Sequence, residues 1–199
     1  MQFNNMLQEI CHASAMKAAV AMSKFLKTPL KIDIKPIKVE NIQNIELPNH
    51  FNESTVGLYV PIDSGIKGGS SMLSSKKSAL ATCDLMLSRA VGFTNEITEV
   101  EESALKEFAN IVLGNFLTPF SHSLLIASLM HRPATYEHDT SAAIIKHIRS
   151  MLSNTIGENS VLNIAFAYEH DNVKGDINIV LDEKKIHSLL QKMMALTNG

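Results

Sequence analysis

The sequence predicts an α+β fold in which long helices pack on a central antiparallel sheet. Three observations support this prediction. Apolar residues recur at helical spacing in two long segments, apolar and polar residues alternate in shorter segments between them, and the two halves of the chain resemble each other. A chain of 199 residues buries about 70% of its unfolded surface, so it needs no disulfide or metal to hold a core.

The first half begins with a helix and continues with strands. Residues 7–26 place apolar side chains at steps of three and four, which predicts the helix. Residues 31–39 alternate apolar and polar, and Pro36 favours an edge strand or a bulge. The remaining predicted elements of this half are a polar loop at 40–54, a strand at 55–62, turn glycines at 65, 68 and 69, a short strand through 73, and a helix over 76–90 capped by Ser75.

The second half opens with the longest helical pattern in the chain. Thr98 and Glu101 have the spacing of a capping box, and the pattern runs from 99 to about 130. Pro119 should kink or split this helix, because its ring displaces the carbonyl of Asn115. The elements expected after it are a short extended piece, a helix at 141–152, a strand at 160–168, a turn at 171–175, a strand at 176–181 and a helix at 183–196.

The two halves match at an offset of 98 residues. The matched positions of the long helices are Leu7, Glu9, Ile10 and Leu26 in the first and Leu105, Glu107, Phe108 and Leu124 in the second. The closing helices match as well, at 76–80 and 184–189. Such self-similarity indicates two copies of one unit that cannot bury its own sheet face. We therefore expect a single pseudo-twofold domain, 1–199, built from helix-strand-strand-helix repeats at about 1–97 and 98–199.

Composition and charge argue against several classes of function. The chain has 18 Lys+Arg and 20 Asp+Glu, with no long basic run, so we expect no nucleic-acid partner. No segment approaches the roughly 18 apolar residues of a membrane span and no basic signal peptide is present, so we expect a cytoplasmic protein with no membrane partner. Cys11 and Cys83 lack paired spacing, which indicates reduced thiols, and the scattered histidines predict no metal site.

A polar stripe on the second long helix is the strongest candidate site. Ser103, Glu107, Asn110 and Gly114 follow at steps of four, three and four, within about 60° around the helix. The opposite side is apolar and should face the core, at Leu105, Phe108, Val112 and Phe116. Inside a helix, Asn lowers helix stability by about half a kcal/mol relative to Ala, and Gly lowers it by about one kcal/mol. When an exposed helix face carries such destabilising residues and they improve no packing, the face is usually a functional site.

These residues resemble a family signature. Ser103-x3-Glu107-x2-Asn110, followed after 22 residues by Pro133, is similar to the signature of the CheC/CheX/FliY family, chemotaxis phosphatases that dephosphorylate the response regulator CheY. The resemblance extends to the length, the internal duplication and the strand-strand-helix ending. It is closest to the CheC branch in two segments, VGLYVPIDSGIKGGSSMLSSKKSALATCDLMLSR and ESALKEFANIVLGNFL.

The resemblance implies a hydrolase of two-component signalling that removes the aspartyl phosphate from a CheY-like receiver domain. Glu107 would bind the receiver by pairing with the Lys near its phosphorylation site, and Asn110 would orient a water for in-line attack. Ser103, Gly114 and Pro133 would complete the motif. A carboxamide donates and accepts hydrogen bonds but is no base at neutral pH, so it resembles the water-orienting Gln of GTPases. The Mg²⁺ would belong to the receiver, so we expect no cofactor on this chain.

The same template on the first helix gives an altered site. It selects Asn5, Glu9, His12 and Met16, so Glu9 is kept while His12 stands in place of the Asn and Met16 in place of the Gly. Pro36 lies one residue beyond the spacing that the motif requires. We therefore expect one working site, with Glu9 and His12 marking a weak or inactive second one.

Other functions remain open at the level of sequence. Taken alone, an exposed Glu and Asn are ordinary surface residues of an amphipathic helix. A CheC-like module without catalytic activity would bind a phosphorylated receiver, or the chemotaxis protein CheD, and the altered first site favours that alternative. Retention of Asn110 favours the enzyme. A structural role in the flagellar switch, as in FliY, is less expected because no additional domain for rotor assembly is evident.

Overall fold

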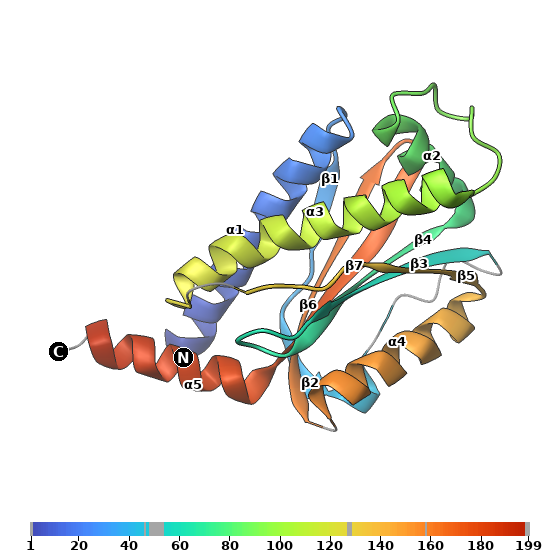
Figure 1. The fold of residues 1–199 in the computed structure, drawn as a ribbon. Helices are drawn as coiled ribbons and strands as arrows, with labels where there is room; N and C mark the ends of the chain where they lie inside the picture. Colours follow the sequence, from blue (N-terminus) through green and yellow to red (C-terminus); the bar gives the residue numbers. More distant parts are fainter. Residues whose placement is uncertain (1, 46, 48–53, 127–128, 158, 198–199) are drawn as a thin grey trace.

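The fold is a seven-stranded antiparallel sheet with helices on both faces (Figure 1). The computed structural model describes residues 2–45, 47, 54–126, 129–157 and 159–197. One face is covered by α1 (Gln2–Phe25), α2 (Lys76–Met86), α3 (Glu99–Ser123) and α5 (Glu183–Thr197), and the other by α4 (Ser141–Ile156) and a short 3-10 helix, Ile42–Asn44. The predicted α+β architecture, with long helices on an antiparallel sheet, is confirmed.

The order of the strands is symmetric about the centre of the sheet. The strands are β1 (Lys31–Ile34), β2 (Lys38–Asn41), β3 (Thr55–Ile62), β4 (Gly68–Ser75), β5 (Thr135–Asp139), β6 (Ser160–His170) and β7 (Val173–Asp182). Their order is β1-β6-β7-β4-β3-β5, with β2 also pairing with β6. Each half of the chain therefore adds its edge strand to the hairpin of the other half. This exchange is consistent with the predicted pseudo-twofold repeat, and it joins both halves into one sheet.

The ends of α1 and α3 carry the same backbone geometry. Lys27 and Leu125, separated by the predicted offset of 98 residues, have φ angles of 53° and 54°. In each case the next amide donates to the carbonyl of a serine five residues earlier, at 3.1 Å and 2.9 Å. This is the hydrogen bonding of a helix that ends on a left-handed residue. The two helices pack side by side on the sheet (Figure 1), and their inner faces share one core.

The bulge predicted at Pro36 is present. Ile34 pairs with Phe166 and Lys38 pairs with Asn163, so the three residues 35–37 stand opposite two residues of β6. Pro36 lies at this extra residue, on the edge of the sheet, where its missing N–H breaks no ladder in the middle of the sheet. The strand predicted at 31–39 is therefore observed as β1 and β2, placed end to end.

Other predicted boundaries are wrong. α3 is not split at Pro119 and ends at Ser123 instead of near 130. Phe116 and Phe120 stack at 5.4 Å across the proline and are both fully buried, so packing on either side holds the helix through one missing hydrogen bond. The helix stops where Leu125 becomes left-handed.

The remaining differences concern shorter segments. Gly68 and Gly69 lie in β4 and not in a turn, and a Cβ at Gly69 would come 2.5 Å from Tyr59 Oη. α2 ends at Met86 and β7 begins at Val173, whereas the sequence predicted about 90 and 176. Within the loop predicted at 40–54, residues 46 and 48–53 lie outside the described residues.

Cys11 and Cys83 are packing residues. Both are free and completely buried, and burial raises the pKa of each thiol to about 12. A thiol with such a raised pKa is a poor nucleophile and a poor metal ligand at neutral pH. Neither cysteine therefore belongs to a reactive site.

The start of α3 is held by a network that sequence patterns did not predict. Asp84, fully buried at the end of α2, accepts hydrogen bonds from the amides of Gly92 (2.8 Å) and Thr94 (3.1 Å) in the loop that leads to α3. Arg89 pairs with Glu101 at 2.7 Å, and Glu101 also accepts from the amide of Thr98 at 3.1 Å. The predicted capping box is thus present and is tied to α2 by Arg89.

This network predicts an acid-sensitive start of α3. The hydroxyl of Thr98 and the guanidinium of Arg89 lower the pKa of Glu101 from 4.5 to about 2. Its contribution to stability is therefore complete above about pH 4.5 and is lost as the pH falls toward 2. Glu101→Gln should lower the free energy of unfolding at neutral pH and flatten its decline in acid, as measured by urea unfolding across this range.

Glu102→Gln is the matched control, since among the described residues Glu102 pairs with Lys106 alone, on the helix surface. That variant should keep the acid dependence of the unaltered chain. If Glu101→Gln kept the same dependence, another carboxylate would be responsible for it.

Candidate functional site

The predicted polar stripe lies on the outer face of α3. Ser103 and Glu107 are exposed, and Asn110 and Gly114 are partly exposed. The opposite side is buried as predicted, at Leu105, Phe108, Val112 and Phe116. The apolar side of α3 therefore fixes the direction of the stripe, because rotating the helix would expose four core side chains.

Asn110 is held by the segment that contains Pro133. Its Oδ1 accepts a hydrogen bond from the amide of Ala134 at 3.1 Å. Because a backbone amide can only donate, this bond fixes which end of the carboxamide is the oxygen. Within the described part of the chain, no acceptor takes up the Nδ2 group of Asn110. The carboxamide thus has its oxygen occupied and two N–H donors available.

Glu107 is available for an external partner. In the part of the chain that the structure describes, it forms no hydrogen bond or ion pair, and neither does Ser103. The adjacent base Lys106 is already paired with Glu102. An exposed carboxylate one turn before Asn110 is therefore free to meet a cation.

Gly114 leaves the surface beside Asn110 open. A Cβ at this position would lie 3.8 Å from Nε2 of His131, an ordinary contact distance. Packing within the chain therefore does not require a glycine here. The absence of a side chain leaves room for a partner to approach α3 closely.

Three of the four corresponding residues of the first half, Asn5, Glu9 and His12, line a hollow of about 630 Å³ between α1 and the bulge. Glu9 and His12 lie on its α1 side, and Pro36 lies on the other side. Both halves carry the same bulge, because 132–134 also stand opposite two residues of β3, between the pairs His131–Ile62 and Thr135–Tyr59. Pro36 and Pro133 therefore occupy matching places in the sheet, although Pro36 lies one residue further from its helix. The structure therefore brings the residues of the altered site together, although His12 replaces the amide.

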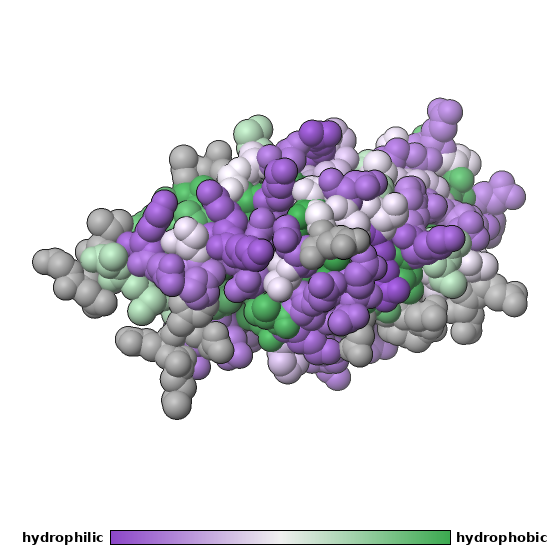
Figure 2. All heavy atoms as spheres, turned by 90° about the horizontal axis from the view of Figure 1, so that it is seen from below, coloured by the Kyte–Doolittle hydropathy of each residue, from purple (hydrophilic) through white to green (hydrophobic). Residues whose placement is uncertain are grey.

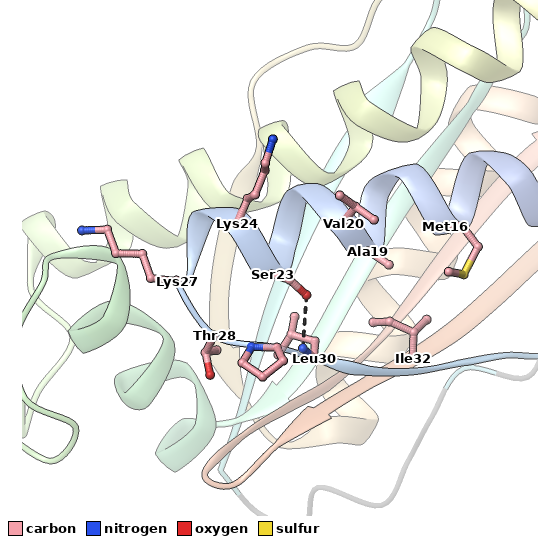
Figure 3. Close-up of a pocket in the computed structure, with 10 residues that line it drawn as sticks. Met16, Ala19, Val20, Ser23, Lys24, Lys27, Thr28, Leu30 and Ile32 are labelled. Atoms are coloured by element: carbon pink, nitrogen blue, oxygen red, sulfur yellow. Dashed lines mark hydrogen bonds between the residues drawn. The ribbon is translucent and has the colours of Figure 1, made fainter.

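A second groove, of about 540 Å³, follows along α1 (Figure 3). Met16 of α1 and Ile32 of β1 point toward each other across it, and Ser23 Oγ accepts from the Leu30 amide at 3.1 Å. Met16 and Val20 are 44% and 53% exposed. At the matched positions the second half has Gly114 and Thr118. At these two positions the outer face of α1 is apolar, whereas that of α3 has no side chain at Gly114 and a hydroxyl at Thr118.

The described residues also bear on metal binding and membrane insertion. Among the described residues, no three His, Cys, Asp or Glu side chains are grouped so that they could hold a metal ion. The described helices are also too short or too polar to cross a membrane. The surface seen from below is mostly hydrophilic, with small separate apolar areas (Figure 2).

Comparison with known proteins agrees with this fold and this helix. A model of the CheC-like family matches residues 100–126, which contain most of α3. Thermotoga maritima FliY has 22% identity and a TM-score of 0.71, with 96% of each chain covered. The chain has the CheC-like fold. The match on α3 and the structural likeness support the CheC/CheX/FliY family inferred from the sequence.

Two further relatives show how widely the CheC-like fold is shared. CheX from Desulfovibrio desulfuricans has 14% identity and a TM-score of 0.57, covering 87% of this chain and 99% of its own. FliM from H. pylori, solved in complex with SpeE, has 12% identity and a TM-score of 0.61, covering 98% and 95%. No curated protein sequence matches this CheC-like chain. Because FliM shares the fold, the fold alone does not select between catalysis and binding.

The sequence identified the polar stripe and missed the residues that hold it. Asn110 and the segment of Pro133 are brought together, while Ser103 lies at the far end of the stripe. His131 and Arg132 border the site as well, and neither was predicted. Their only sequence signal is their position directly before Pro133.

The open surface at Gly114 can be tested through stability. Gly114→Ala should raise the free energy of unfolding by about 0.5–1 kcal/mol, since alanine is the better helix former and its Cβ fits. Gly57→Ala is the contrasting control, because a Cβ there would lie 2.5 Å from Ile144 Cγ2 and should destabilise the chain. Thermal and urea unfolding measure both. A destabilised Gly114→Ala variant would show that this glycine serves internal packing.

Proposed function

We propose that this chain is a phosphatase that hydrolyses the aspartyl phosphate of a CheY-like receiver domain, in the cytoplasm, with one working site on α3. The observation that supports the proposal is the hydrogen bonding of the Asn110 side chain. Its carbonyl oxygen accepts from the Ala134 amide, and among the described residues neither its two N–H donors nor Glu107, one helical turn away, has a partner.

The proposed reaction is an in-line attack of water on phosphorus. The bond between phosphorus and the receiver's aspartyl oxygen breaks, the carboxylate leaves, and inorganic phosphate is released. Asn110 would donate a hydrogen bond to the water oxygen and hold it in line, which lowers the barrier by orientation rather than by removing a proton. The Mg²⁺ that neutralises the phosphoryl oxygens would be bound by the receiver.

Glu107 would serve docking. An exposed carboxylate can pair with a Lys beside the receiver's phosphorylation site, and the absence of a side chain at Gly114 would let the receiver approach α3. Glu9 could bind a receiver in the same way, but His12 is bulkier than a carboxamide and Met16 fills the space that Gly114 leaves open. The first half would then be weak or inactive as a phosphatase.

A binding module is the second candidate. FliM shares this fold and has been solved in complex with FliG and with SpeE. The apolar groove beside Met16 and Val20 favours some protein contact on α1. A phosphorylated receiver or CheD would be the partner under this alternative, and no phosphate would be released.

The proposal predicts unequal effects of the two matched residues. Asn110→Ala should lower the rate of phosphate release from a purified phosphorylated receiver by about a hundredfold, because the contact that orients the water is lost. His12→Ala should leave the rate nearly unchanged. Release of phosphate, with circular dichroism to confirm folding, measures both. Equal losses in the two variants would contradict a single working site.

Glu107 is predicted to act in binding. Glu107→Ala should raise the dissociation constant for the phosphorylated receiver, and the affinity of the unaltered chain should fall with salt, because the contact begins as an exposed ion pair. Glu96→Ala, which removes an exposed carboxylate before α3, is the matched control. Normal binding with slow turnover in Glu107→Ala would assign this residue to chemistry instead.

A further inference from the structure

The β3–β4 hairpin forms hydrogen bonds with the segment that leads to Ala134, the partner of Asn110. Ser64 Oγ accepts from the amide of Met130 at 2.5 Å and donates to the Met130 carbonyl at 3.2 Å. The amide of Arg132 donates to the carbonyl of Pro61 at 2.9 Å, and its Nε donates to Asp63 at 2.5 Å. Residues 130–132 are therefore held by hydrogen bonds of both their main chain and the Arg132 side chain.

The segment held by the hairpin leads along the chain to the hydrogen-bond partner of Asn110. Arg132 is followed by Pro133, whose ring fixes φ, and then by Ala134, whose amide donates to Asn110 Oδ1. Ala134 itself is 94% buried and has little freedom to move. The N–H group that orients the carboxamide therefore lies between the segment held by the hairpin and the β5–β3 ladder, which begins at Thr135.

The first half holds the matching stretch differently. Before Pro36, the strand β1 pairs with β6 through a regular ladder of four residues. Before Pro133, only one bridge pair is present in the described residues, between His131 and Ile62. Beside Asn110, side chains of the hairpin form hydrogen bonds with this stretch. Beside His12, the matching stretch is held by backbone hydrogen bonds of the ladder.

We propose that Ser64 and Asp63 are positioning residues for Asn110. They fix the segment 130–134 so that the carboxamide presents its N–H donors to the water or to the phosphoryl group. The catalytic part of this inference depends on the function proposed above. The pair of Arg132 with Asp63 is exposed, so it contributes little to global stability. Its loss should therefore loosen the segment without unfolding the chain.

Amide hydrogen exchange tests the positioning independently of any activity. In the full chain, Ser64→Ala and Asp63→Asn should each speed the exchange of the Ala134 amide, measured by NMR, while leaving the melting temperature nearly unchanged. Asp171→Asn, at the tip of the β6–β7 hairpin, is the matched control and should have no effect at Ala134. Unchanged exchange in both hairpin variants would overturn the proposal.

The catalytic consequence is tested with the phosphorylated receiver. Ser64→Ala should lower kcat by about tenfold with KM unchanged, since a displaced group orients the water poorly, and Ser64→Thr, which keeps the hydroxyl, should restore it. Faster exchange at Ala134 with an unchanged kcat would overturn the positioning role. If the unaltered chain released no phosphate, the proposed function would fail, while the exchange of Ala134 would still decide whether the hairpin holds Asn110.

Asn110→Asp separates the two ends of the carboxamide. A carboxylate keeps the acceptor for Ala134 and loses both donors, so the Ala134 amide should stay protected while phosphate release falls by about a hundredfold. Near-normal turnover in this variant would overturn the assignment of Asn110 as a donor.

Discussion

The pairing of β4 with β7 is the interaction on which the rest of the structure depends. It joins the hairpins of the two halves over six residue pairs and makes one continuous sheet from strands that would otherwise end at open edges. Gly68 permits this approach, because a Cβ there would lie 2.2 Å from the carbonyl oxygen of Val180. Since α1 and α3 both pack on that shared sheet, their inner faces are committed to the core, and their outer faces alone are available for function.

The same exchange of edge strands explains why the two outer faces can differ. In each half the proline after the long helix belongs to an edge segment that pairs with the other half, so each site is completed by both halves of the chain. Before Pro36 the backbone pairs with β6 over the four residues of β1. Before Pro133 the described residues pair with β3 at a single bridge, and side chains of the β3–β4 hairpin add further contacts. A segment held by side chains can be adjusted by single substitutions, which allows one site to specialise while the fold stays unchanged.

Periodicity and repetition predicted the fold because they report on local geometry and on burial. The outward direction of Asn110 followed from spacing, and the proline at 36 indicated an edge strand or a bulge. The symmetric order of the strands is consistent with the predicted repeat at 98 residues. The end of α3 did not follow from spacing, because Leu125 takes a left-handed backbone without the glycine that usually signals it. Asp63 and Ser64 were missed for another reason. They meet Arg132 and Met130 only after folding, across more than sixty residues of chain.

The choice between an enzyme and a binding module rests on chemistry that the fold does not contain. FliY, CheX and FliM share this architecture at low identity, so the arrangement of helices and strands is compatible with either role. Docking requires charge and an accessible surface, and Glu107 with Gly114 supplies both. It does not require a carboxamide whose oxygen is tied to Ala134, because such a bond only restricts how the side chain can adapt to a partner. Fixed orientation is useful where a small molecule such as water must be placed accurately, and the catalysis proposed at Asn110 would depend on it.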